Sequence, residues 1–192
     1  YWFMHKYSKI YYFIDGFDID EINKLNKNIS LIYRNYKNKY NLELIKKIRN
    51  FCSLNKRKFY ISNNLKIAKY LKLDGVYIPS FNNLQNFKNL NVNRNFTIIG
   101  SAHNKVELIN KINQGCVEIF IAPIFKTNKS NFYLNILKFN LLTLYFDRKF
   151  IALGGINKKN YSKLKLIKLF GFASISWIKK TGLKKLGRFY NL

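Results

Sequence analysis

Acidic residues are scarce in this chain of 192 residues, where 9 aspartates and glutamates face 35 lysines and arginines for a net charge of +26. Long apolar runs are missing as well. The longest candidate, residues 139–146, is interrupted by Asn140 and Thr143 and is far shorter than the ~18 apolar residues that a membrane span needs. We therefore expect no membrane span and no membrane partner.

Cysteine and proline are almost absent, with two residues of each. Cys52 and Cys116 lie far apart with no second pair, which excludes a scaffold of several disulfides and favours a reduced compartment. The first residues show neither a basic segment followed by an apolar one nor a small-residue cleavage site, as a secretory signal would. We therefore expect a cytoplasmic protein.

Apolar side chains are plentiful, because 48% of the residues are hydrophobic and 17% are aromatic. This composition excludes a disordered basic tail. No linker, repeat or shift in composition divides the chain, so we expect one domain over residues 1–192.

The excess of positive charge is what a nucleic-acid binder requires. The lysines are nevertheless spread along the whole chain, and the densest cluster, residues 179–188, has the pattern of an amphipathic helix with a solvated face. Frequent Lys, Asn, Ile and Tyr together are also what a drift toward AT-rich codons produces. The sequence therefore disfavours nucleic acid as the partner, while the same charge would attract an anionic small molecule.

Short apolar runs, most of them continuous as in parallel strands buried on both faces, alternate with segments of helical spacing. The runs are residues 9–14, 29–34, 58–61, 75–78, 96–99, 117–121, 149–153 and 172–176, and the clearest helical segments are residues 42–52, 65–71, 106–112 and 164–167. Residues 80–95 have the pattern of a loop. Eight strands predict a single compact (β/α)8 TIM barrel with short helices, and a doubly wound open sheet is the alternative.

Polar and small residues follow the predicted strands, at the end where such barrels place their active sites. Glycines after strand seven and small residues after strand eight allow backbone N–H groups to approach a phosphate. Arg34 at a strand end needs an anionic partner, for which Asp15 and a ligand phosphate are the alternatives.

Three strand ends carry short motifs: Ile-Gly-Ser-Ala-His at 99–103, Ile-Ala-Pro-Ile-Phe-Lys-Thr at 121–127 and Ala-Leu-Gly-Gly-Ile-Asn at 152–157. In order and spacing they resemble the thiamine phosphate synthase and TenI family of (β/α)8 barrels. That family has Ser-x-His after strand five, Gly-Pro-hydrophobic-aromatic-Pro-Thr after strand six and Ala-Ile-Gly-Gly-Ile-Asn after strand seven.

The resemblance implies one of two reactions. The synthase branch joins a pyrimidine pyrophosphate to a thiazole phosphate and releases pyrophosphate, whose charge is neutralised by an Arg, a Lys and Mg²⁺ held by carboxylates. The TenI branch isomerises the thiazole phosphate. The substrate-binding candidates that the resemblance implies are Arg34, Asn63, Ser101, Thr127, Lys129, Gly154, Gly155, Ile175 and Ser176.

This chain departs from the synthase pattern at the metal site. Asn64 stands where the synthase branch has one aspartate, and Asn82 or Asn83 stands where it has another. Neutral amides are poor replacements for the carboxylates that hold Mg²⁺. We therefore predict no metal and no cofactor, with Mg²⁺ expected only if the synthase reaction is retained.

The TenI branch requires a base and a phosphate anchor but no metal. His103 corresponds to the histidine of that branch, and histidine readily exchanges protons near neutral pH. The alternative is that His103 caps or packs against the helix that opens at Asn104.

We expect an enzyme of thiamine biosynthesis that binds a phosphorylated thiazole and is TenI-like or degenerate, with His103 as the catalytic candidate. Two alternatives remain: an active synthase that also binds the pyrimidine pyrophosphate, and an inert basic barrel that binds nucleic acid or a protein. A homo-oligomer is compatible with the sequence.

Overall fold

The computed structural model describes residues 7, 9–37, 40–83, 87, 92–128 and 131–183. The strands are β1 (Lys9–Ile14), β2 (Ile29–Tyr33), β3 (Phe59–Ser62), β4 (Gly75–Ile78), β5 (Thr97–Ala102), β6 (Glu118–Ile121), β7 (Lys149–Leu153) and β8 (Gly171–Ala173). The helices are α1 (Ile19–Lys24), α2 (Leu42–Leu54), α3 (Leu65–Tyr70), α4 (Lys105–Asn113), α5 (Asn135–Thr143) and α6 (Ser176–Thr181), with a 3-10 helix, η1, at Tyr161–Leu166.

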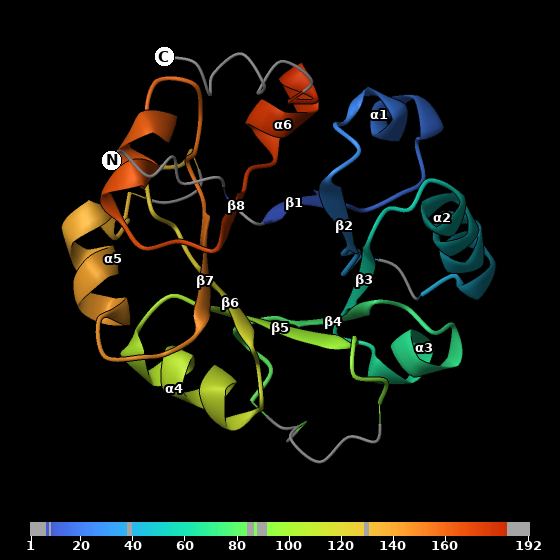
Figure 1. The fold of residues 1–192 in the computed structure, drawn as a ribbon, viewed down its shortest axis with the longest axis horizontal. Coiled ribbons are helices and arrows are strands. Elements are labelled where there is room, and N and C mark those ends of the chain that lie inside the picture. Colours follow the sequence, from blue (N-terminus) through green and yellow to red (C-terminus); the bar gives the residue numbers. More distant parts are fainter. Residues whose placement is uncertain are drawn as a thin grey trace.

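The strands form a closed parallel barrel in chain order, because each pairs with the next and β8 pairs with β1. Figure 1 shows the strands in a central ring with the helices around it. The predicted (β/α)8 TIM barrel is confirmed, and the doubly wound alternative is excluded. Within the described residues, no helix is long and apolar enough to cross a membrane.

Two strand ends differ from the prediction. The ladder between β5 and β6 continues to the pair Ala102–Ile121, so Ser101 belongs to the strand rather than to the loop after it. Strand β8 stops at Ala173 instead of continuing through residue 176, because Ile175 has helical backbone angles and Ser176 begins α6. The hydroxyl of Ser174 meanwhile donates to the Ile156 carbonyl, 2.9 Å away.

Four helices begin at an Asp or Asn whose side chain accepts a hydrogen bond from a backbone N–H three residues later. The caps are Asp18, Asn41, Asn64 and Asn104. Because each cap is worth about 1 kcal/mol, the many asparagines of this chain contribute directly to where its helices start.

Helix α4 forms where the sequence predicted a helix over residues 106–112. It buries Leu108 and Lys111, Ile112 packs against the core, and Val106 is 69% exposed. The ammonium group of Lys111 lies 2.6 Å from the Asn82 carbonyl and 2.9 Å from Oε1 of Gln114, whose amide nitrogen binds the same carbonyl at 2.8 Å. Burial lowers the pKa of Lys111. A lysine can occupy this buried position because its ammonium group donates to the Asn82 carbonyl and to the Gln114 side chain.

The connection between β4 and β5 packs against α4. Its Phe87 is buried and donates its backbone N–H to the Gln114 carbonyl at 3.0 Å. Within the described parts of residues 79–96, no helix forms, as the sequence predicted for residues 80–95. Lys111 and Gln114 thus hold this connection against the barrel through its backbone.

Aromatic rings fill the inside of the barrel. Tyr11, Phe13, Tyr60, Tyr77 and Phe120 lie in one buried cluster, with neighbouring ring centroids 5.2–5.7 Å apart. A second, larger cluster lies between the sheet and the helices. Each strand is therefore buried on both faces, which explains its continuous apolar sequence.

The interior has one buried carboxylate, Glu118, among the described residues. It accepts a hydrogen bond from the Tyr11 hydroxyl and an ion-paired hydrogen bond of 2.8 Å from Lys9. Burial acts to lower the pKa of Lys9, but the contacts with Glu118 and Tyr60 outweigh it and raise that pKa. The amino-terminal end of the barrel is thus closed by a polar cluster whose charges are matched.

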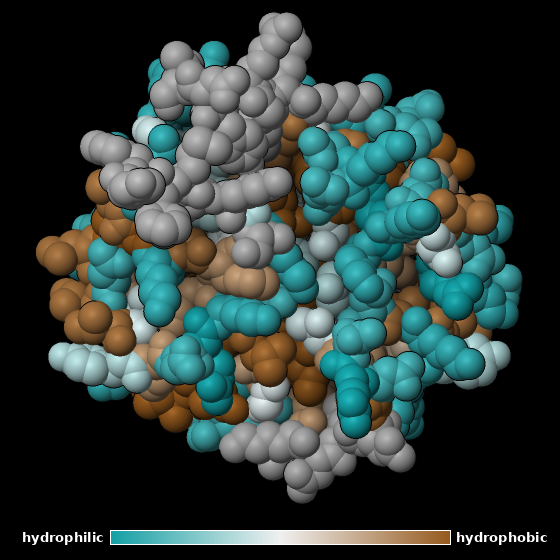
Figure 2. Space-filling model, viewed as in Figure 1, coloured by the Kyte–Doolittle hydropathy of each residue, from teal (hydrophilic) through white to brown (hydrophobic). Residues whose placement is uncertain are grey.

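The surface is mixed. In Figure 2, hydrophilic residues cover much of the right-hand side, and apolar residues gather at the left edge, where α5 lies in Figure 1. Leu137, Leu141 and Leu144 are each more than 60% exposed there.

We expect the fold to lose stability in alkali. Burial raises the pKa of Tyr11, Tyr60 and Tyr77, that of Tyr77 to about 12. In the unfolded chain these phenols ionise near pH ~10, so their contribution is complete below about pH 10 and is lost as the pH rises through the folded-state values. Urea unfolding at a series of pH values from about 8 to about 11.5 should show this decline. Tyr77→Phe should make it shallower, and a flat profile would contradict the prediction.

Candidate active site

The candidate site lies at the carboxyl ends of the strands, where the loops that carry Arg34, Asn63, His103, Thr127 and Gly154 begin. The parallel barrel brings all of these ends to one face. We call this face the mouth of the barrel.

Arg34 directly follows β2, and its guanidinium carbon lies 4.3 Å from the centroid of the Phe13 ring. It lines a cavity of about 430 Å³ at the ends of β1 and β8, together with Asp15, Ile175 and Lys179. Within the described residues, Arg34 and Asp15 form no ion pair, so the cation stacks on the aromatic interior instead. Stacking leaves the donors at the edge of the guanidinium available to an anion.

Tyr77 connects Arg34 to β5. Burial raises the pKa of its phenol, and side-chain hydrogen bonds with Ser101 and with Arg34 oppose that rise. Ser101 is 5% exposed. Two of the predicted binding residues, Arg34 and Ser101, are thus brought together by a tyrosine that the sequence analysis did not select.

The end of β3 is held by two tyrosines from the connection after β2. The hydroxyl groups of Tyr36 and Ser62 lie 2.9 Å apart, and Tyr40 donates to the Ser62 carbonyl. The Tyr36 ring also meets Phe81 from the β4–β5 connection at 5.6 Å between centroids. The loop after β2 is therefore joined to the end of β3 by hydrogen bonds and to the β4–β5 connection by an aromatic contact.

Asn63, Asn64 and Asn82 occupy the region where carboxylates would hold Mg²⁺. The amide nitrogen of Asn82 donates to the Asn63 side-chain oxygen at 2.6 Å, and the Asn64 side chain accepts from the Ile67 N–H at 2.9 Å as the cap of α3. The amide oxygens of Asn63 and Asn64 are thus engaged. In the described part of the chain, no three His, Cys, Asp or Glu residues group as metal ligands. This set of donors does not fit Mg²⁺.

His103 lies between β5 and α4 and is paired with Glu107. The Glu107 carboxylate lies 2.9 Å from Nδ1 of His103 and accepts the His103 backbone N–H at 2.8 Å. Asn104, the cap of α4, binds the same glutamate by its side chain. The imidazole is therefore oriented by a carboxylate, with Nε2 as its second nitrogen. These contacts at the start of α4 are also what the alternative predicts, in which His103 caps or packs against that helix.

Gly154 and Gly155 follow β7 and lie against the loop after β6. Their φ angles are +95° and +70°. A Cβ on Gly154 would lie 2.6 Å from the Pro123 Cβ, and one on Gly155 would lie 2.5 Å from the Phe125 and Lys126 carbonyl oxygens. The pair is glycine because two loops touch here, which is sufficient reason without a ligand.

For the remaining predicted binding residues that it describes, the structure gives an exposure and a position in a loop or helix, but no polar side-chain contact with another described residue. Thr127 is half-buried in the loop that Gly155 contacts, whereas Ile175 and Ser176 are exposed at the start of α6. Lys129 lies outside the described residues. The loops after β6 and β7 are therefore in contact, and Ser174 joins β8 to them through Ile156.

Glu107 and Tyr77 are the functional candidates that sequence reasoning missed. Glu107 lies in the first turn of α4, where a carboxylate can reach back to the residues that precede the helix, and this position was available from the sequence. Tyr77 had no such signal, because a strand buried on both faces does not reveal which residues point inward.

A family model described as thiamine monophosphate synthase matches residues 25–178. The thiamine-phosphate synthase of Pelagibacter ubique (strain HTCC1062) is 32% identical over 158 residues, which are 78% of this chain and 74% of that protein. That of Prochlorococcus marinus (strain SARG) is 30% identical over 142 residues, 69% of this chain but 39% of the relative. The chain thus spans about two fifths of the length of this relative.

Solved structures show the same fold at lower identity. The thiamine phosphate pyrophosphorylase from Pyrococcus furiosus is 17% identical with a TM-score of 0.74, and 96% of each chain is covered. That from Bacteroides thetaiotaomicron is 16% identical with a TM-score of 0.62, over 95% of this chain and 98% of the other.

The contact between the loops after β6 and β7 should tolerate no side chain at residue 155. We expect Gly155→Ala to lower the free energy of unfolding by about 1–3 kcal/mol, because of its φ angle and the carbonyl oxygens it would meet. Gly16 is the matched control, since a Cβ there has no atom within 4 Å. Gly16→Ala should change stability by less than about 0.5 kcal/mol in the same denaturant titration. Equal effects of the two substitutions would show that the loop contact is not tight.

Proposed function

Because the chain belongs to the thiamine monophosphate synthase family, we propose that its mouth binds a thiazole phosphate and moves a proton on that ring without a metal, in the manner of the TenI branch. The observation that carries the proposal is the pairing of His103 with Glu107, 2.9 Å from carboxylate oxygen to Nδ1.

In the proposed reaction His103 is the base. Nε2 accepts a proton from one position of the thiazole, and the electron pair left behind shifts through the conjugated ring. The imidazolium formed is stabilised by the Glu107 carboxylate. The imidazolium proton exchanges with solvent, and a proton is then returned from Nε2 to another ring position, so the step is balanced without an oxidant or a co-substrate.

The phosphate of the substrate needs a separate anchor. We assign it to Gly154, Gly155 and Ser176, with Ile175 beside them and with Thr127 and Lys129 from the loop after β6. The contact of that loop with Gly155 supports a joint role for these residues. Arg34, Asn63 and Ser101 complete the proposed binding set, and Arg34 lines one cavity together with Ile175.

The synthase reaction is the second candidate, because the curated relatives are named thiamine-phosphate synthases. Arg34 with Tyr77 and Ser101 offers donors to a pyrophosphate. The donor set at Asn63, Asn64 and Asn82 argues against it, since the leaving pyrophosphate would lack a carboxylate-held cation.

Proton exchange tests the first candidate. The chain should catalyse deuterium incorporation from D₂O into thiazole phosphate in the presence of EDTA, followed by proton NMR. His103→Gln should lower that rate about 100-fold or more, the usual contribution of a general base. Lys105→Gln changes an exposed residue at the start of α4 and should leave the rate unchanged. An unchanged exchange rate in His103→Gln would show that His103 is not the base.

Product formation tests the second candidate. The chain is incubated with the pyrimidine pyrophosphate and the thiazole phosphate, with and without Mg²⁺, and thiamine phosphate is measured by chromatography. We expect no metal-dependent product, because the amides are engaged with each other and with α3. Thiamine phosphate that appears only with Mg²⁺ would establish the synthase reaction instead.

A further inference from the structure

Two adjoining cavities lie at the amino-terminal end of the barrel, on the face opposite the mouth. Their volumes are about 310 and about 390 Å³, and both are lined by Lys58, Lys72, Leu73 and Asp74. They are bordered by the turns that lead from α2 into β3 and from α3 into β4. We call them together the basal groove.

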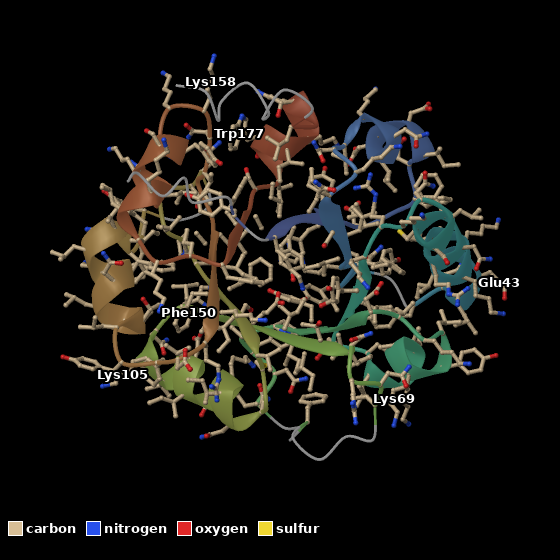
Figure 3. All side chains as sticks on the ribbon, in the orientation of Figure 1. Glu43, Lys69, Lys105, Phe150, Lys158 and Trp177 are labelled. Carbon is tan, nitrogen blue, oxygen red and sulfur yellow. The ribbon has the colours of Figure 1, made fainter. Side chains whose placement is uncertain are left out.

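The basal groove is strongly cationic. Its lining includes Arg49, Lys56, Arg57, Lys58, Lys69 and Lys72, against a single carboxylate, Asp74. Figure 3 shows Lys69 on the outer side of α3. Asp74 is already engaged, because it accepts from Lys58 at 2.6 Å and from the Phe59 backbone N–H at 2.9 Å. Within the described residues, the other cations of the groove have no carboxylate partner.

Arg57 distinguishes this groove from an ordinary basic surface. It is only 7% exposed, and its Nε has no hydrogen-bond partner among the residues that the structure describes. One terminal nitrogen donates to the Asn26 and Ile29 carbonyls at 3.0 and 2.7 Å, so the side chain is fixed in place. Burial lowers the pKa of Arg57, and no carboxylate opposes this effect. Arg57 also lines one of the two cavities, so an anion there would lie beside a guanidinium that is fixed in place and has no carboxylate partner among the described residues.

Lys56 and Lys72 follow the ends of α2 and α3 in the left-handed conformation, with φ of +52° and +49°. Glycine or asparagine usually occupies such a position. The carbonyl ends of two helices attract cations, and that accounts for one lysine at each turn. It does not account for Arg49 and Arg57 beside them.

We propose that the basal groove binds a small anion with two or more phosphoryl groups, independently of the reaction at the mouth. The charge excess matches a multiply charged ligand, and the guanidinium and ammonium groups are the usual donors to phosphate oxygens. The cavity volumes are those of small-molecule sites, which favours a short polyphosphate over an extended nucleic-acid strand.

Calorimetric titration of the full chain with inorganic tripolyphosphate at near-physiological salt tests the proposal. Arg34→Ala provides a background in which the mouth has lost its arginine, and binding should persist there. The double variant Lys56→Asn and Lys72→Asn should weaken binding about tenfold or more. Asparagine suits the left-handed conformation, so this variant should fold at least as well as the parent.

The matched control is Lys163→Asn with Lys165→Asn. These lysines are exposed on η1 and lie outside the groove, and their loss lowers the net charge equally. The control should bind tripolyphosphate as the parent does. The proposal is overturned if no binding occurs, if the control pair weakens it as much, or if Arg34→Ala abolishes it. It is also overturned if single-stranded RNA binds at the groove and tripolyphosphate does not compete.

Discussion

The packed aromatic interior of the barrel is the constraint on which the rest of the structure depends. Tyr11, Phe13, Tyr60, Tyr77 and Phe120 fill the space that eight parallel strands enclose. The three tyrosines place hydroxyl groups in this interior, and buried hydroxyl groups require partners. At one end the partner of Tyr11 is Glu118, neutralised by Lys9; at the other, Ser101 and Arg34 act to lower the pKa of Tyr77, which burial raises. The candidate site therefore rests directly on the core, since Arg34 stacks on the ring of Phe13.

The continuous apolar strands allowed the fold to be predicted from the sequence, and the same property hid most of the site. A strand buried on both faces has no alternation, so the inward direction of Tyr77 was not readable. The ends of β5 and β8 were misplaced by a few residues, because ladder length depends on the neighbouring strand. The sequence predicted helix α4 but not the burial of Lys111, because the acceptors of its ammonium group come from residue 82 and from Gln114, the C-cap of the helix. The polar residues after the strands were predicted to share one face because topology alone determines that.

Several of the few acidic residues of this chain form ion pairs in the structure. Glu118, Asp74, Glu107 and Glu21 each pair with a basic side chain or a histidine. Glu21 also accepts from Tyr12 at 2.6 Å. The pair of Glu118 with Lys9 is the buried one, and removing that carboxylate would leave Lys9 unpaired, whereas the partners of the other three are exposed. A chain with so few acids has used them for its own stability, and asparagines stand at the mouth in their place.

The clamp of Lys111 and Gln114 on the Asn82 carbonyl binds a backbone atom, which is present whatever side chain residue 82 carries. The position of the β4–β5 connection therefore does not depend on which side chain residue 82 carries. A substitution of Asn82 would change the side chain at the mouth and its hydrogen bond to Asn63, but it would leave the clamp on the backbone intact. The loop would therefore keep its place while the donors at the mouth change, whereas loss of Lys111 or Gln114 would release the loop itself.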